Sequence, residues 1–382
     1  MQGNPLTDFS TTAPARLATR LAFFAAGFSM ACCAPLFPFI KANIGADEGQ
    51  FGLVLLCLGL GSIIAMPVTG VIAARRGARP MVRLGGFGLV AFLPLLAFAG
   101  TPMSLGAALF FFGASLGTID VAMNIHGAEV EGKEGRALMS NFHAQFSIGG
   151  FFGAGLMTVL LSLGVTTVVA ALIGAFVALV AILLSGSRLL AVSGGEPEPY
   201  SVPRGIVLLL AILAGVTFLV EGGILDWGAL LIIDREIAPA QNAGIGYILF
   251  SVAMVAARLT GDRIVMALGE FRVLIMGGIA AILGIGIVLV SPWALVALSG
   301  FVLIGLGAAN LVPIVFSAAG RQKIMPPSLA VASVTTTGYA GVLMGPALVG
   351  FVADATSLPL AFAVLALLMA LVPLTARRVV CA

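Results

Sequence analysis

Charged residues are scarce in this chain. Asp, Glu, Lys and Arg make up 9% of the 382 residues, whereas a soluble globular domain contains about 25%. Hydrophobic residues make up 60%, and the mean hydropathy is +1.16. Such a chain cannot cover a folded surface with polar groups. This excludes water as its solvent and indicates an integral membrane protein.

The residues that build catalytic and metal sites are also rare. The chain has two histidines, His126 and His143, and four cysteines without metal-ligand spacing. It has no Gly-Lys-Ser/Thr loop for phosphate, and a net charge of +3 is too small to favour nucleic acid. We therefore expect no enzyme, no ATP-driven pump, no cofactor and no metal.

The hydrophobic residues form long charge-free runs. A helix needs about 20 apolar residues to cross a bilayer, whereas the strands of a membrane barrel alternate over about 10. The runs predict an all-α membrane protein with twelve transmembrane helices. They are Leu21–Ile40, Phe51–Ala74, Leu84–Ile119 (one crossing and most of a second), Ala137–Ser187 (two), Gly205–Ile233, Ile237–Ala257, Val273–Gly320 (two), Ile324–Ala353 and Ala355–Ala376.

The basic residues are unevenly distributed between the two sides of the membrane. Of 19 Lys and Arg residues, 16 fall on the side of the chain termini, only Lys41 and Arg235 fall on the other side, and Arg258 lies within a helix. Lys and Arg concentrate in cytoplasmic loops. Both termini are therefore predicted to be cytoplasmic, in a bacterial inner (plasma) membrane.

The chain is predicted to consist of two six-helix halves. The predicted parts are a cytoplasmic tail (1–20), a six-helix bundle (21–186), a cytoplasmic linker (187–204), a second bundle (205–376) and a tail (377–382). Gly77 and Gly269 are 192 residues apart, and so are Gly153 and Gly345. Such repeats are typical of transporters, whose substrate site lies near the midplane between the halves.

This organisation resembles the major facilitator superfamily over essentially the whole chain, which implies that family's fold. The family's loop motif, Gly-x-x-x-Asp-Arg-x-Gly-Arg-Arg/Lys, is matched by Gly70, Arg75, Gly77 and Arg79, with Ala74 in place of the Asp. In the family this motif latches neighbouring helices at the cytoplasmic face. An alternative is that these arginines only set the topology.

The second half keeps a displaced form of the same motif in Gly261-Asp262-Arg263. Arg258 lies near the inner end of its predicted helix, where it could instead extend to the interface or pair with a neighbour. The candidate gating residues are Arg75, Arg76, Gly77, Arg79, Arg258, Asp262 and Arg263.

A narrower resemblance involves polar residues of the fourth, fifth and seventh helices. Asp120 and Asn124, followed by 141–147, look like the fucose–proton symporter branch. Glu221-Gly222-Gly223 with Asp226-Trp227 looks like rhizopine-permease-like sugar transporters. The first helix has no acid, unlike that of the fucose symporters, so a fucose assignment is not carried over.

Ionisable groups inside a membrane are costly and are functional candidates by default. Asp120 and Glu221 are the predicted proton-coupling residues, although Asp120 could instead be a structural acid. Asp120 and Asn124 share one helix face, which also carries Gly113, Gly117 and Gly127. Asp226 lies about 140° around the helix from Glu221, so the two face one cavity only if the helix loosens between them.

The substrate-binding candidates are Asn124, Asn141, His143, Gln145, Asp226, Trp227 and Asn310. Asn141 and Gln145 share a helix face opposite to that of His143, which could instead bond to a neighbouring helix. Asn310 follows Asp120 by 190 residues and is its expected counterpart. His126, with Glu129 and Glu131, is expected in an inner loop region. Asp226 could also sit at the outer interface.

The sequence predicts a secondary active transporter that couples protons to the movement of a small polar solute, such as a sugar or polyol, by alternating access. Its partners would be the substrate, protons and the lipid bilayer, and a monomer is expected. Two alternatives stay open: a drug/proton antiporter, and a membrane sensor or scaffold that transports nothing.

Overall fold

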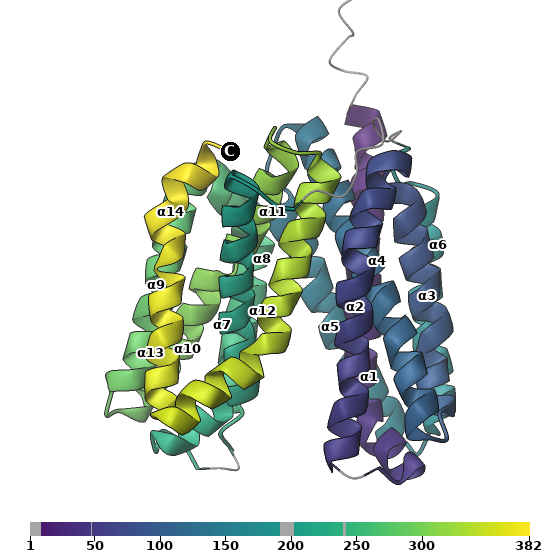
Figure 1. Cartoon of the computed structure of the whole chain (residues 1–382), viewed down its shortest axis with the longest axis horizontal. Coiled ribbons are helices and arrows are strands. Elements are labelled where there is room, and N and C mark those ends of the chain that lie inside the picture. The colour runs from purple at the N-terminus through teal and green to yellow at the C-terminus, as the bar shows by residue number, and fades with distance from the viewer. Residues whose placement is uncertain (1–8, 47, 192–201, 240–241) are drawn as a thin grey trace, which may run out of the picture. The chain divides into compact units, whose positions relative to one another are not determined.

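The computed structural model describes residues 9–46, 48–191, 202–239 and 242–382, and every long regular element among them is a helix (Figure 1). The helices are α1 (Phe9–Ile44), α2 (Glu48–Arg76), α3 (Ala78–Phe98), α4 (Pro102–Glu134), α5 (Met139–Ser162), α6 (Thr167–Gly186), α7 (Ile206–Asp234), α8 (Ile245–Leu268), α9 (Glu270–Val290), α10 (Ala294–Ala308), α11 (Leu311–Arg321), α12 (Pro327–Ala355), α13 (Leu358–Met369) and α14 (Leu371–Val380).

The described residues contain ten segments that are long and apolar enough to cross a membrane. In this count α10 and α11 form one segment, and α13 and α14 form another. The two parts of α12 meet at a bend of 41° and make an eleventh span when counted together. The remaining long helix is α8, with 24 residues. The prediction of an all-α membrane protein with about twelve crossings is confirmed.

The chain divides into two compact units. Unit 1 comprises Met1–Gly135, Phe142–Ser201 and Pro326–Ala332, and unit 2 comprises Arg136–Asn141, Val202–Met325 and Ser333–Ala382. The predicted linker lies mostly on residues 192–201, and the predicted N-terminal tail begins with residues 1–8; both stretches lie outside the described residues. The predicted domain boundaries stay predictions.

Glycines bring the helices of unit 1 into close contact. A Cβ on Gly113 of α4 would overlap the carbonyl oxygen of Leu58 in α2, and one on Gly117 would meet Ser62. The hydroxyl of Ser62 also donates to the Gly113 carbonyl over 2.8 Å. Small residues at helix contacts allow this packing within a membrane. The glycine face of α4 therefore approaches a neighbouring helix, as its sequence predicts.

The two units repeat each other's local geometry at the predicted spacing. Gly77 joins α2 to α3 with a φ of 76°, and Gly269 joins α8 to α9 with a φ of 79°. Only glycine adopts this conformation readily. A Cβ on Gly149 of α5 would overlap the Phe24 carbonyl of α1, and a Cβ on Gly341 of α12 would overlap the Gly215 carbonyl of α7.

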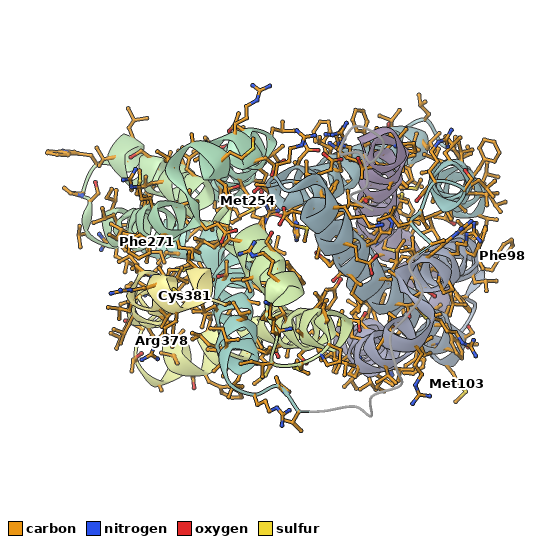
Figure 2. All side chains as sticks on the ribbon, turned by 90° about the horizontal axis from the view of Figure 1, so that it is seen from above. Phe98, Met103, Met254, Phe271, Arg378 and Cys381 are labelled. Carbon is orange, nitrogen blue, oxygen red and sulfur yellow. The ribbon has the colours of Figure 1, made fainter. Side chains whose placement is uncertain are left out.

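Apolar side chains cover the outside of each bundle. Phe98 and Met103 point outward from unit 1, and Phe271 points outward from unit 2 (Figure 2). Met103 is 85% exposed, a position that would be unfavourable in water and is suited to lipid. The polar and charged side chains inside each bundle are therefore the informative ones.

Candidate functional site

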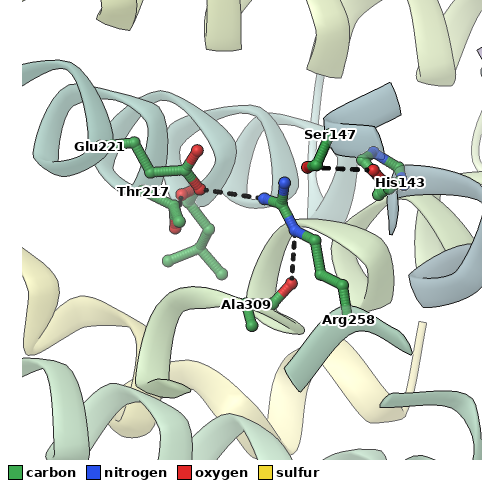
Figure 3. Close-up of polar contacts among 7 residues, drawn as sticks. His143, Ser147, Thr217, Glu221, Arg258 and Ala309 are labelled. Atoms are coloured by element: carbon green, nitrogen blue, oxygen red, sulfur yellow. Dashed lines mark hydrogen bonds and ion pairs between the residues drawn. The ribbon is translucent and has the colours of Figure 1, made fainter. Parts of the chain in front are cut away.

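An ion pair in the interior of unit 2 joins two predicted functional residues. Arg258 of α8 donates from Nη2 to Oε1 of Glu221 in α7 over 3.4 Å (Figure 3). The side chains are 8% and 18% exposed, respectively. A guanidinium beside a carboxylate offsets much of the cost of placing either charge in a membrane. Arg258 therefore pairs with a neighbouring helix, which is one of the two alternatives that its sequence position leaves open, and its role in gating stays a prediction.

The same guanidinium also bonds to a break in a helix. Its Nε donates to the Ala309 carbonyl over 3.2 Å (Figure 3). Ala309 and Asn310 lie between α10 and α11, four and three residues before Pro313. Because proline has no N–H, the Ala309 carbonyl has no donor four residues ahead. Arg258 replaces that missing donor with a charged one.

Asn310 is the second residue of the break. It is 5% exposed, and its Oδ1 accepts no hydrogen bond from the described residues. This oxygen packs against Gly261 of α8, where a Cβ would overlap it. A Cβ on Gly305 of α10 would overlap the Phe250 carbonyl of α8, just as a Cβ on Gly113 of α4 would overlap the Leu58 carbonyl of α2. That equivalence spans 192 residues, so Asn310 corresponds to Thr118, and the expected correspondence with Asp120 is wrong.

In unit 1, Asp120 and Asn124 form a polar pair on α4. The amide nitrogen of Asn124 donates to Oδ1 of Asp120 over 3.2 Å and to its main-chain carbonyl over 2.9 Å. Asn124 is buried, and its own Oδ1 accepts no bond from the described residues. Asp120 forms no ion pair with any described residue. It is thus a carboxyl group whose partner is an uncharged amide.

The polar residues of α5 separate onto different neighbours, as their spacing predicts. His143 is 8% exposed, and its ring lies 5.2 Å from the ring of Phe23 in α1. Ser147 donates to the His143 carbonyl over 3.4 Å (Figure 3). Gln145 is half-buried, and its amide bonds to none of the described residues. His143 therefore packs on α1, and Gln145 keeps its hydrogen-bonding groups available.

The two other candidates of α7 lie apart from Glu221. The helix α7 continues unbroken from Ile206 to Asp234 through the Gly222-Gly223 pair. It is not loosened there, so Glu221 and Asp226 point in different directions. Asp226 is exposed, while Trp227 covers Gly350 of α12 and its Nε1 has no acceptor among the described residues. The structure does not bring Asp226 to the Glu221–Arg258 pair.

The predicted gating residues behave in two ways. Arg75 and Arg76 are exposed at the end of α2, Arg263 is exposed five residues before the end of α8, and Arg79 is half-buried in the first turn of α3. Asp262 accepts a bond at Oδ1 from the main-chain N–H of Asn141, in the first turn of α5, over 3.3 Å. That N–H is among those a helix cannot satisfy by itself. Asn141 thus contacts a gating candidate through its backbone, a role its side chain does not predict.

The expectation that His126 lies in a loop region is wrong. His126, Glu129 and Glu131 belong to α4, which extends to Glu134, and His126 is fully buried. Its Nε2 accepts from the Leu190 N–H over 2.9 Å, and its Nδ1 bonds to Thr19 Oγ1 over 2.9 Å. Polar partners keep the end of α4 helical. The low apolar content of this segment, taken alone, indicates a loop.

Comparison with known proteins decides the family. The sequence profile of the Major Facilitator Superfamily matches residues 20–323. The chain belongs to this superfamily. The transporter is 47% identical over 368 residues to an uncharacterized MFS-type transporter of Yersinia pestis, with 95% of each chain covered. It is 30% identical to Membrane protein MosC of Rhizobium meliloti, with 88% of this chain and 83% of MosC covered.

The fold of the transporter is also found among solved structures. The E. coli fucose:proton symporter FucP matches with a TM-score of 0.77 over 97% of this chain and 99% of that chain, at 18% identity. Identity this low supports the fold alone. Together these comparisons confirm the family prediction: the chain is a multi-pass membrane transporter and not an enzyme.

Proposed function

We propose that this transporter is a proton-coupled secondary active transporter that moves a small polar solute, a sugar, polyol or related compound, by alternating access. Asp120 carries the coupled proton. Glu221 and Arg258 form a polar centre whose charges respond to substrate, and Glu221 is the second candidate proton site.

The observation that carries this proposal is the contrast between the two carboxylates. Asp120 has an amide partner and no cation among the described residues, so it binds and releases a proton without separating an ion pair. A proton on Glu221 must instead compete with Arg258 at 3.4 Å. The first arrangement suits a site that titrates in every cycle, and the second suits a site that holds a fixed charge pair.

The chemistry of the polar groups supports the substrate class. Asn124, Gln145 and Asn310 offer amides, and Glu221 with Arg258 offers an acceptor and donors. Hydroxyl groups act as donor and acceptor at once and pair with all of these. The fold relative FucP is named a fucose:proton symporter. A drug antiporter would be expected to offer a more apolar surface to its cargo.

We place the transporter in the inner (plasma) membrane with both termini cytoplasmic. The support is the concentration of Lys and Arg on one side of the predicted topology. Single cysteines at Arg79 and Arg321, in a background without the four native cysteines, should resist an impermeant thiol reagent in intact cells. A cysteine at Thr356 should react. Labelling of Arg79→Cys from outside would reverse the orientation.

The test of coupling uses purified transporter in proteoliposomes, after a thermal-shift screen of sugars and polyols has found a stabilising solute. Asp120→Asn keeps the side chain's shape and removes its titration. This variant should exchange solute between equal pools and fail to accumulate it against a gradient. Asp354→Asn, the same change at an exposed acid of α12, is the control and should accumulate normally.

Solute addition to energised cells should also alkalinise the medium if the transporter is a symporter. Acidification would favour the antiporter, and the absence of any solute-dependent flux would favour a sensor. Uphill accumulation by Asp120→Asn would remove Asp120 from the proton pathway.

A further inference from the structure

A groove runs along one side of unit 1, between α2 and α3 and over α4. Its volume is about 260 Å³, and its lining is almost wholly apolar. Ile64, Val68 and Ile72 contribute from α2, Leu84 from α3 and Phe111 from α4. Four of these are at least half exposed: Ile64 at 51%, Val68 at 54%, Leu84 at 60% and Phe111 at 51%.

Close packing on both sides of α4 explains why the groove exists. Gly61 of α2 meets the Phe110 carbonyl of α4, and Gly85 of α3 meets Ser115 and Ile119 of α4. The two outer helices therefore rest directly on α4, which forms the floor between them. Thr69 donates to Thr118 over 3.2 Å beneath the groove, so the polar groups of the floor bond to each other.

Two arginines lie one helical turn beyond Ile72, the last lining residue of the groove on α2. Ile64, Val68 and Ile72 follow one another at helical spacing, and Arg76 continues that row by one turn, with Arg75 beside it. Gly77 alone joins α2 to α3, so the two walls converge at this end. Arg75 and Arg76 are both exposed, and neither forms an ion pair with a described residue.

We propose that this groove binds an anionic glycerophospholipid, with an acyl chain along α2, α3 and α4 and the phosphate against Arg75 and Arg76. Complementarity in both parts carries the proposal: a continuous apolar trough fits a hydrocarbon chain, and two unpaired cations at its end fit a negative headgroup. From Gly61 to Arg76 the row rises about 22 Å at ~1.5 Å per residue, enough for most of an acyl chain and its headgroup.

The turn between α2 and α3 lies at the end of unit 1 where α1 begins (Figure 1). The ends of α1 and α4 there are already joined by an ion pair, in which Arg16 donates to Glu134 over 3.0 Å. Arg83 is also engaged, since it donates to the Gly186 carbonyl over 2.6 Å. Arg79, in the first turn of α3, is half-buried, so Arg75 and Arg76 are the exposed, unpaired arginines next to the groove among the described residues.

The experiment measures lipid binding to the purified full-length transporter by native mass spectrometry and thermal shift. The probes are dioleoyl-phosphatidylglycerol, dioleoyl-phosphatidylcholine with the same acyl chains, and inorganic phosphate. Phosphatidylglycerol should bind more tightly than phosphatidylcholine and raise the unfolding temperature. Arg75→Gln/Arg76→Gln should weaken the binding of phosphatidylglycerol about 30-fold, because each arginine contributes roughly fivefold in affinity at a membrane surface. Arg75→Lys/Arg76→Lys should keep most of the affinity.

Matched variants test the two halves of the site separately. Val68→Trp fills the groove without changing the arginines and should weaken the binding of phosphatidylglycerol. Leu367→Trp, at a 73% exposed position of α13, should not weaken it. Arg377→Gln/Arg378→Gln removes two exposed arginines of α14 and should leave binding unchanged. Equal losses in both arginine pairs, normal binding by Val68→Trp, or an equal thermal shift with phosphate alone would overturn the proposal.

Discussion

The Nε of Arg258 donates to the main-chain carbonyl of Ala309 over 3.2 Å, so a cation of α8 completes the hydrogen bonding of a break between α10 and α11. Pro313 contributes to the break, because it has no N–H to offer that carbonyl. Glu221 holds the other side of the same guanidinium. Any change in the charge of Glu221 therefore acts on the donor that stabilises the break.

Replacing Pro313 with alanine should restore the missing N–H. The Ala309 carbonyl then has a donor within its own helix, and this donor replaces the hydrogen bond from Arg258. Proline costs up to about 3 kcal/mol in a helix interior, of which Arg258 already offsets a part. We expect Pro313→Ala to raise the unfolding temperature of the purified transporter and to slow transport severalfold.

Pro67→Ala is the control for that change, because Pro67 also lies inside a long helix, α2, and no described cation bonds to the Ile63 carbonyl four residues before it. It should leave transport near the wild-type rate. Pro313→Ala transporting at the wild-type rate would show that the break is not needed for the cycle.

The Glu221–Arg258 pair should be strongly coupled in a double-mutant cycle. Arg258→Gln leaves the Glu221 carboxylate without its cation, and breaking a buried pair in this way costs about 3–5 kcal/mol. Arg258→Gln/Glu221→Gln removes both charges and should recover more than half of that loss. Chemical or thermal unfolding in detergent measures each variant.

The control cycle uses Arg321 and Glu270, a pair within the same unit. Two hydrogen bonds of 2.9 and 2.7 Å join them, but the Arg321 side chain is 43% exposed. Exposed pairs contribute about 0–1 kcal/mol. If the two cycles gave equal coupling energies, the interior position of Glu221 and Arg258 would contribute nothing special.

Much of the fold follows from the sequence, because long apolar runs can satisfy their backbone groups in a bilayer only as helices. The halves are recognisable because the turns at Gly77 and Gly269 need the same unusual φ. The Glu221–Arg258 pair is not recognisable, since it depends on how α7 and α8 are rotated about their axes. Pro313 indicates that the Ala309 carbonyl has no donor within its helix, but α2 stays continuous through Pro67, so a proline alone does not predict a break.

Low hydropathy is a poor predictor of a loop where the polar partners of a segment lie far along the chain. The stretch from His126 to Glu134 reads as a loop, yet it is the last part of α4. Arg16 pairs with Glu134 across 118 residues, and Leu190 bonds to His126 across 64. Such partners cannot be paired from spacing alone. Asp120 and Asn124 were predictable because their bond lies within one helix.

Gly113 should be the least replaceable of the α4 glycines. Alanine there would drive its Cβ into the Leu58 carbonyl of α2, a backbone atom that cannot rotate away. Overpacking of this kind costs about 1–3 kcal/mol, so Gly113→Ala should lower the unfolding temperature and the yield. Gly155→Ala in α5, whose Cβ would meet nothing within 4 Å, should be neutral or stabilise by about 0.5–1 kcal/mol. Similar effects for the two variants would argue against the close α2–α4 contact.

His126 should control the stability of the chain segment that follows α6. The Thr19 hydroxyl donates to the Ala15 carbonyl over 2.9 Å, so in its bond with His126 it accepts from Nδ1. The other ring nitrogen, Nε2, therefore carries no proton and accepts from the Leu190 N–H. His126→Phe keeps an aromatic ring and removes both bonds, leaving the Leu190 N–H unpaired at a cost of about 1–3 kcal/mol. Hydrogen exchange at Leu190, measured by mass spectrometry, should become 10- to 100-fold faster, by that cost converted at ~1.4 kcal/mol per factor of ten.

His143→Phe, the same change at a histidine that packs on Phe23, should leave hydrogen exchange at Leu190 unaffected. Exchange at Leu190 that does not respond to His126→Phe would mean that other contacts hold this segment in place.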